Sequence, residues 1–188
     1  MDLAPIARAR TDGVAPDVLP PAVLFPALRA LRAEGYERLH LCGSAPLTYP
    51  WLYELLDFAR SMGFALSIEA DGQDVAQDQL SVLRGLEHVI LRPSVDAVPR
   101  TDGRICAEEY SCCARIFQAL EREDCMTTAL MTVSRSVLPE VPGFVAAMAG
   151  AGADVVRLRP YLVSGRAAWK PGRRGLCPSE TARLWLMG

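Results

Sequence analysis

The sequence lacks the short motifs that mark several common enzyme classes. It contains no Gly-x-Ser-x-Gly, no phosphate-binding P-loop and no His-Glu-x-x-His, so we do not expect a hydrolase nucleophile elbow, a P-loop nucleotide site or a zincin metal site. Its two histidines, His40 and His88, have no histidine partner four residues away. Both are therefore predicted to be packed or surface residues rather than metal ligands.

Cysteine spacing gives no metal site either. None of the six cysteines forms a Cys-x2-Cys pair, which is the usual spacing of zinc ligands. The adjacent Cys112 and Cys113 would point about 100° apart on a helix, so they cannot easily serve one ion. Small buried thiols are the favoured interpretation. Cys106 and Cys177 are the least constrained and are candidates for a reactive thiol.

Long apolar runs and a strong charge of one sign are also missing. No apolar segment approaches the ~20 residues that span a bilayer, and the first ten residues lack the apolar core of a secretory signal. The net charge is -2 and the isoelectric point is about 5.7, which argues against a nucleic-acid or anionic-membrane surface. We expect a cytoplasmic protein, with no nucleic-acid or membrane partner and with free thiols.

What is present is a regular alternation of short apolar segments and amphipathic stretches. The chain has 188 residues, 51% of them hydrophobic and 22% charged, which is enough to bury one core. Strands are predicted at 39–42, 65–68, 89–95, 127–133 and 155–159, and helices at 21–34, 51–62, 77–86, 107–123, 139–149 and 179–187. The predicted fold is α/β, a partial (β/α) TIM-like barrel or open parallel sheet of about five parallel strands with helices outside.

Composition divides the chain into three predicted parts. Residues 1–20 hold three prolines and no clean periodicity, and are interpreted as an N-terminal arm. Residues 21–168 form the partial barrel, and residues 169–188 a C-terminal loop and short helix. The basic stretch 166–174 is interpreted as a solvated loop, with docking of an acidic partner as the alternative.

Three segments carry a family resemblance. They read LCGSAPLTYPWLYELLDFARSMGFALSIEADG from Leu41, SVDAVPRTDG from Ser94 and VVRLRPYLVSGRA from Val155. The first resembles the second strand, Gly-Gly-Glu-Pro loop, helix and third strand of the radical S-adenosylmethionine (SAM) superfamily. The second resembles that family's Ser-Leu-Asp-Gly strand end, and the third its sixth strand and following loop. Over residues 21–168 the chain is similar to the cofactor- and peptide-modifying maturases of this superfamily.

The chain departs from the family at two places. The family's Cys-x3-Cys-x2-Cys loop, which holds a [4Fe–4S] cluster, would precede the helix beginning at Pro21, but residues 1–20 contain no cysteine. In the Gly-Gly-Glu-Pro loop, whose acid and backbone carbonyls receive the SAM amino group, Ala45 replaces the acid. A [4Fe–4S] cluster and radical chemistry are therefore not expected, and SAM is left as a candidate ligand with a weakened site.

Polar side chains converge at the predicted strand ends. Successive side chains on a strand alternate faces. Ser67 therefore shares a face with Glu69, Arg92 shares one with Ser94 and Asp96, and Arg157 shares one with Arg159. No catalytic residue is assigned. Two interpretations stay open: an anion- or zwitterion-binding pocket, or a salt-bridge network that satisfies itself. The candidate ligand-binding residues are Gly43, Ser44, Pro46, Glu69, Ser94, Asp96, Arg157 and Arg159.

Three functional hypotheses follow. The first is a radical-SAM-like protein without its own cluster, acting as an accessory or binding protein whose partner is a radical SAM enzyme or a substrate peptide. The second is an enzyme that retains a pocket for SAM or another small molecule. The third is a truncated or split-barrel remnant that needs a partner chain, since an exposed first strand would favour pairing.

Overall fold

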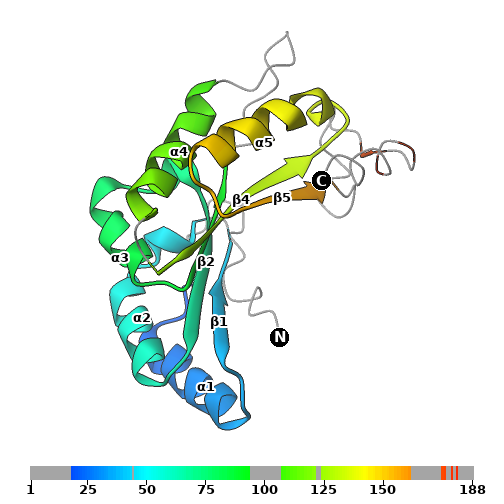
Figure 1. Ribbon diagram of the computed structural model, residues 1–188. Helices are drawn as coiled ribbons and strands as arrows, with labels where there is room; N and C mark the ends of the chain where they lie inside the picture. Colours follow the sequence, from blue (N-terminus) through cyan, green and yellow to red (C-terminus); the bar gives the residue numbers. More distant parts are fainter. Residues whose placement is uncertain are drawn as a thin grey trace.

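Five parallel strands form one sheet in the computed structural model, which describes residues 18–43, 45–93, 107–121, 124–161, 175, 176, 179 and 181. Their spatial order is the order of the sequence, β1-β2-β3-β4-β5. The predicted α/β fold with about five parallel strands is confirmed (Figure 1). The strands are β1 Arg38–Leu41, β2 Ala65–Asp71, β3 His88–Arg92, β4 Met126–Val133 and β5 Val155–Pro160.

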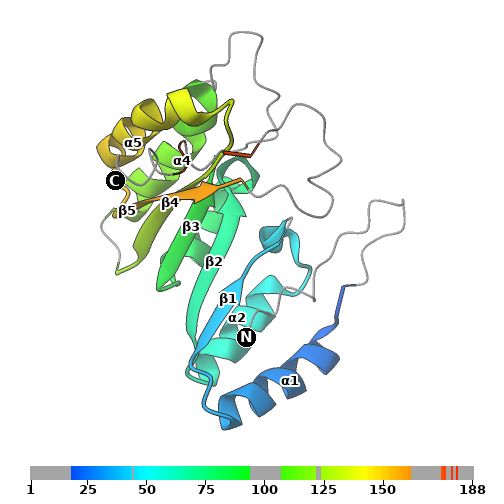
Figure 2. The same ribbon diagram turned by 90° about the vertical axis from the view of Figure 1, so that its right-hand side faces the viewer.

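All five described helices lie on the same side of the sheet (Figures 1 and 2). Each of the last four connects two neighbouring parallel strands, and such crossovers almost always have one hand, which places their helices on one face. The helices are α1 Pro21–Ala33, α2 Leu52–Ser61, α3 Leu80–Arg84, α4 Ala107–Leu120 and α5 Val141–Gly150. Short 3-10 turns occur at η2 Pro46–Thr48, η3 Gly72–Asp74, η4 Gln77–Gln79 and η5 Leu138–Glu140.

The core lies between the sheet and these helices. Along β2, Leu66, Ile68 and Ala70 are buried and alternate with half-buried polar residues. Helices α4 and α5 place Phe117 and Phe144 against the same layer, and both rings are fully buried. The period-2 pattern thus divides the sheet into a helix-covered face and a second face, here called the inner face, that carries polar side chains.

Several predicted boundaries shift by a few residues. The strand predicted at 89–95 ends at Arg92, because Pro93 has no N–H for the ladder. Strand β2 continues past Ile68 to Asp71, where Asp71 pairs in register with Arg92 of β3. The helix predicted at 77–86 begins as the 3-10 turn η4 and is α-helical only over α3. The helix predicted at 179–187 lies almost wholly outside the described residues. No helix in the described part of the chain is both long enough and apolar enough to cross a bilayer.

Candidate functional site

The carboxyl ends of β1, β2 and β3 meet at one edge of the sheet, where parallel folds bind ligands. Strand β1 leads into Gly43, whose φ of 144° is a conformation that glycine adopts without strain. Strands β2 and β3 end with Asp71 and Arg92 side by side. This edge therefore brings a glycine turn, a carboxylate and a guanidinium together.

Arg92 contacts Glu69, Asp71 and Gly43 at this edge, and these residues are here called the Arg92 cluster. Its Nη1 lies 3.4 Å from Glu69 Oε1 and its Nε lies 2.9 Å from Asp71 Oδ1. The second contact is an ion pair, and the buried Nε makes no hydrogen bond within the described residues. Its Nη2 donates a hydrogen bond of 3.2 Å to the Gly43 carbonyl. The Glu69 side chain is only 15% exposed, so these pairs lie where water screens charge weakly.

A second arginine reaches the same carboxylate from the far strand. Arg159 Nη2 lies 3.8 Å from Glu69 Oε1 and 3.3 Å from Thr132 Oγ1. This guanidinium is 49% exposed, so its pair with Glu69 adds little stability. Arg157 lies two residues earlier on β5, on the same face, and is exposed. Glu69 on β2 thus pairs with two arginines, one from the adjacent strand β3 and one from β5.

The amino-terminal half of the inner face holds both histidines. His40 Nδ1 lies 2.8 Å from Ser67 Oγ, and His88 Nε2 lies 2.7 Å from Thr128 Oγ1. Burial lowers the pKa of His88, and the nearby positive charges, Arg157 foremost, lower it further. His88 is therefore neutral at pH 7. This half of the face differs from the Arg92 cluster because neither histidine has a carboxylate as its hydrogen-bond partner in these contacts.

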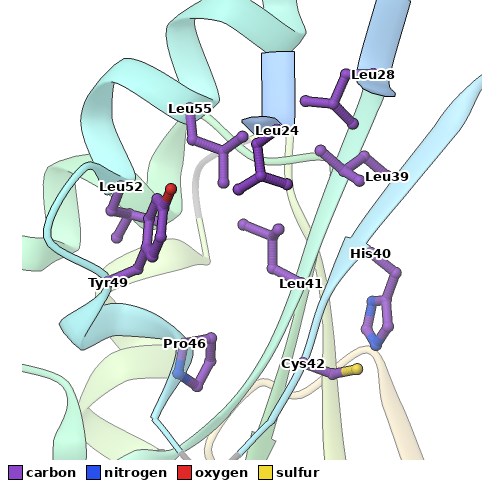
Figure 3. A pocket seen from close by; sticks show the side chains of 10 residues that line it. All are labelled: Leu24, Leu28, Leu39, His40, Leu41, Cys42, Pro46, Tyr49, Leu52 and Leu55. Carbon is purple, nitrogen blue, oxygen red and sulfur yellow. The ribbon is translucent and has the colours of Figure 1, made fainter. Parts of the chain in front are cut away.

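An apolar cavity of about 100 Å³ lies between α1, β1 and α2 (Figure 3). Tyr49 lies at its side and donates a hydrogen bond of 2.8 Å to the Leu19 carbonyl. Burial, together with Glu54, raises the pKa of Tyr49, so the phenol stays protonated as a donor. The residues that line the cavity are Leu24, Leu28, Leu39, His40, Leu41, Cys42, Pro46, Tyr49, Leu52 and Leu55.

The structure brings some of the predicted residues together and separates others. Gly43, Glu69 and Arg159 join the Arg92 cluster, whereas Pro46 lines the apolar cavity. Asp71 was not among the predicted ligand-binding residues. The alternation that places Ser67 and Glu69 on the inner face also places Asp71 there. Ser44, Ser94 and Asp96 lie outside the described residues.

The described cysteines do not gather. Cys113 is buried, and burial raises its pKa to about 12. Cys42 and Cys112 are half-buried and Cys125 is buried, and none of the three is in a disulfide. Within the described ranges, no group of three or more potential ligands among His, Cys, Asp and Glu could hold a metal ion. Cys106 and Cys177, the predicted reactive candidates, fall outside those ranges.

Comparison with known proteins gives two kinds of likeness, and no family model matches the chain. A 75-residue stretch, 40% of this chain, is 31% identical to an S-adenosylmethionine-dependent nucleotide dehydratase of Thermoplasmatales archaeon (strain ISO4-H5). The crystal structure of Streptococcus suis SuiB matches 90% of this chain with a TM-score of 0.68 and 10% identity. The chain is related to the radical SAM superfamily.

Two further SuiB structures match this radical-SAM-related chain over 79% of its length. One is bound to S-adenosylmethionine, with a TM-score of 0.59 and 10% identity, and the other to the precursor peptide SuiA, with a TM-score of 0.58 and 12% identity. At these identities the SuiB likeness concerns the fold. The chain spans less than half of each relative: 27% of the dehydratase and 40% of SuiB in the longest match.

Proposed function

We propose that this chain is a radical-SAM-like protein without its own iron–sulfur cluster, and that it acts as a cytoplasmic accessory or binding protein in a cofactor or peptide modification pathway. Its partner would be a radical SAM enzyme or a substrate peptide. The peptide-bound SuiB neighbour supports a peptide partner. The printed sequence supports the loss of the cluster, because its six cysteines nowhere give Cys-x3-Cys-x2-Cys.

The hydrogen bond from Arg92 to the Gly43 carbonyl carries this proposal. By the resemblance, the carbonyls of this loop receive the amino group of SAM. Here a guanidinium of the chain itself donates to one of them at 3.2 Å. The same guanidinium pairs with Glu69 and Asp71. A ligand ammonium at the Gly43 carbonyl would have to displace this Nη2 donor and would lie against the positive charge of Arg92, so the family's mode of SAM binding does not fit these residues.

The cluster is tested by anaerobic reconstitution of the full chain with iron and sulfide. We expect iron and acid-labile sulfide far below one cluster per chain, since no three cysteines have the family's spacing. A stoichiometric [4Fe–4S] cluster would overturn the proposal. A known radical SAM enzyme treated in parallel shows that the reconstitution itself worked.

SAM binding separates this proposal from the second candidate, an enzyme that retains a SAM or other small-molecule pocket. That candidate is favoured by the SAM-dependent relative and the SAM-bound neighbour, with Glu69, Asp96 and Arg159 in its site. Calorimetry at millimolar SAM should show no binding to the wild-type chain, and Arg92→Ala should bind SAM more tightly than wild type. Arg115→Ala, on α4, is the matched control. Binding by the wild type would favour the enzyme.

The third hypothesis, a split barrel completed by another chain, concerns the first strand. Within the described part, β1 pairs only with β2, so its other edge has no strand beside it. Such an edge favours pairing with another chain. Light scattering of the purified chain tests this, since a stable monomer would count against an obligate partner strand.

A further inference from the structure

The amino-terminal half of the inner face gathers basic side chains and hydroxyls from all five strands. The strand register sets this arrangement, because Ser67 pairs with His40 on one side and with His88 on the other. The three side chains therefore lie side by side on the adjacent strands β1, β2 and β3. Figure 3 shows His40 on the side of β1 away from Leu24 and Leu55. The full set is Arg38, His40, Ser67, His88, Thr128 and Arg157, here called the histidine row.

Each histidine is held in place by a hydroxyl. One ring nitrogen of His40 bonds Ser67 at 2.8 Å, and one of His88 bonds Thr128 at 2.7 Å. The other nitrogen of each ring becomes a second donor when the ring is protonated. His40 is exposed and His88 is half-buried. The row thus offers oriented donors on a surface that a small ligand can reach.

Charge in this region is unbalanced. Three positive or ionisable neighbours, Arg157, His40 and Arg38, all act to keep His88 uncharged, and the opposing charge comes from Asp154. That carboxylate is already bonded to the backbone and hydroxyl of Thr127, each at 2.7 Å.

The other described carboxylates of the inner face do not supply the missing charge. Glu69 and Asp71 pair with Arg92 at the opposite end of the strands. An anion placed at the histidine row would therefore meet two guanidiniums whose charge these acids do not neutralise.

We propose that the histidine row binds a tetrahedral oxyanion, phosphate or sulfate, alone or as a group on a larger ligand. Arg38 and Arg157 would hold the anion from the two edge strands, β1 and β5, and the two imidazole rings would donate to it. The site lies apart from the Arg92 cluster, so it does not depend on whether SAM is bound there. Because the anion favours the protonated ring of His88, binding should weaken as the pH rises from about 5 to 8 and that ring loses its proton.

Sulfate is the probe for the test, because it stays a dianion over this pH range. The chain has only two histidines, so a histidine-labelled sample gives two ring signals by NMR. We expect sulfate to shift both signals saturably and to raise the pKa of His88. Sodium chloride at matched ionic strength is the control, and equal shifts in chloride would overturn the proposal.

Amino-acid substitutions distinguish specific sulfate binding at the histidine row from non-specific attraction of sulfate by positive charge. Arg157→Gln should weaken sulfate binding about tenfold, the loss of one charge-assisted contact. Arg38→Gln should act likewise and serves if Arg157→Gln does not fold, which near-UV circular dichroism reports. Arg115→Gln removes the same charge from α4 and should leave binding unchanged. Equal weakening by Arg115→Gln would show that only net charge matters, and the proposal would fail. Iron reconstitution and SAM calorimetry do not probe these residues, so the two proposals fail independently.

Discussion

Gly72 lies where β2 turns toward the helices, and we predict that a single methyl group there disrupts the fold. It is buried, and a Cβ at this position would overlap Cys113 Sγ and lie 3.4 Å from the Cys113 backbone nitrogen. The sulfur has little room to move, because Cys113 is itself 1% exposed in the middle of α4. The turn η3 and helix α4 would have to separate.

The cost follows from core overpacking. Adding a methyl group to a packed core destabilises a protein by about 1–3 kcal/mol. In a domain of this size each kcal/mol lowers Tm by about 2–4 °C. Gly72 follows Asp71 directly, so the same displacement would also loosen the ion pair between Asp71 and Arg92. Urea unfolding of wild type and Gly72→Ala measures the change in the free energy of unfolding.

A double-mutant cycle isolates the cause. Cys113→Ala removes the sulfur and by itself costs roughly 1 kcal/mol of lost burial. If the overlap is the cause, Gly72→Ala combined with Cys113→Ala should be more stable than the sum of the single changes predicts, by about 1–3 kcal/mol. Costs that add within about 0.5 kcal/mol would refute the reasoning.

Three more predictions concern individual side chains. Arg92→Met leaves Glu69 and Asp71 without their main cation, so urea unfolding should show a loss of about 1–3 kcal/mol, while Arg115→Met stays within about 0.5 kcal/mol; equal losses would contradict the cluster. Hydrogen bonds from Thr127 lower the pKa of Asp154, so its charge stabilises the fold at neutral pH, and that contribution is lost as the pH falls below about 4. The stability difference between wild type and Asp154→Asn should accordingly be larger at pH 7 than at pH 3, and a constant difference would count against this assignment. Burial raises the pKa of Cys113 to about 12, so at pH 8 Cys112 should react with a thiol reagent well before Cys113, as peptide mapping can show. Similar rates for the two thiols in the folded chain would disprove the burial argument.

The sheet could be predicted because its strands follow the period-2 rule. Leu66 and Ile68 are buried while Ser67 and Glu69 turn to the inner face, as the pattern requires. Strand ends were harder to predict, because hydrogen bonding to neighbours sets them. Asp71 has low strand propensity, yet it stays in β2 because Arg92 on β3 stands opposite it.

The site was partly predictable for the same reason. Alternation places Glu69, Arg92 and Arg159 on one face, and the structure joins them. Side-chain alternation predicts the face on which an arginine lies, but not its ion-pair or hydrogen-bond partner. The hydrogen bond from Arg92 to the Gly43 carbonyl joins residues 49 positions apart. It depends on the position of the turn after β1 in the folded structure. The division of the chain at residues 20 and 168 stays a prediction.

The order of the strands has a consequence for how the molecule forms. Each described strand after β1 lies beside the strand made just before it, so pairing among the described strands does not have to wait for a distant segment to emerge from the ribosome. Closing each connection costs little chain entropy compared with a sheet whose neighbours are far apart in sequence. The sheet can grow one unit at a time from its amino-terminal end, and removing β5 should leave the first four strands assembled.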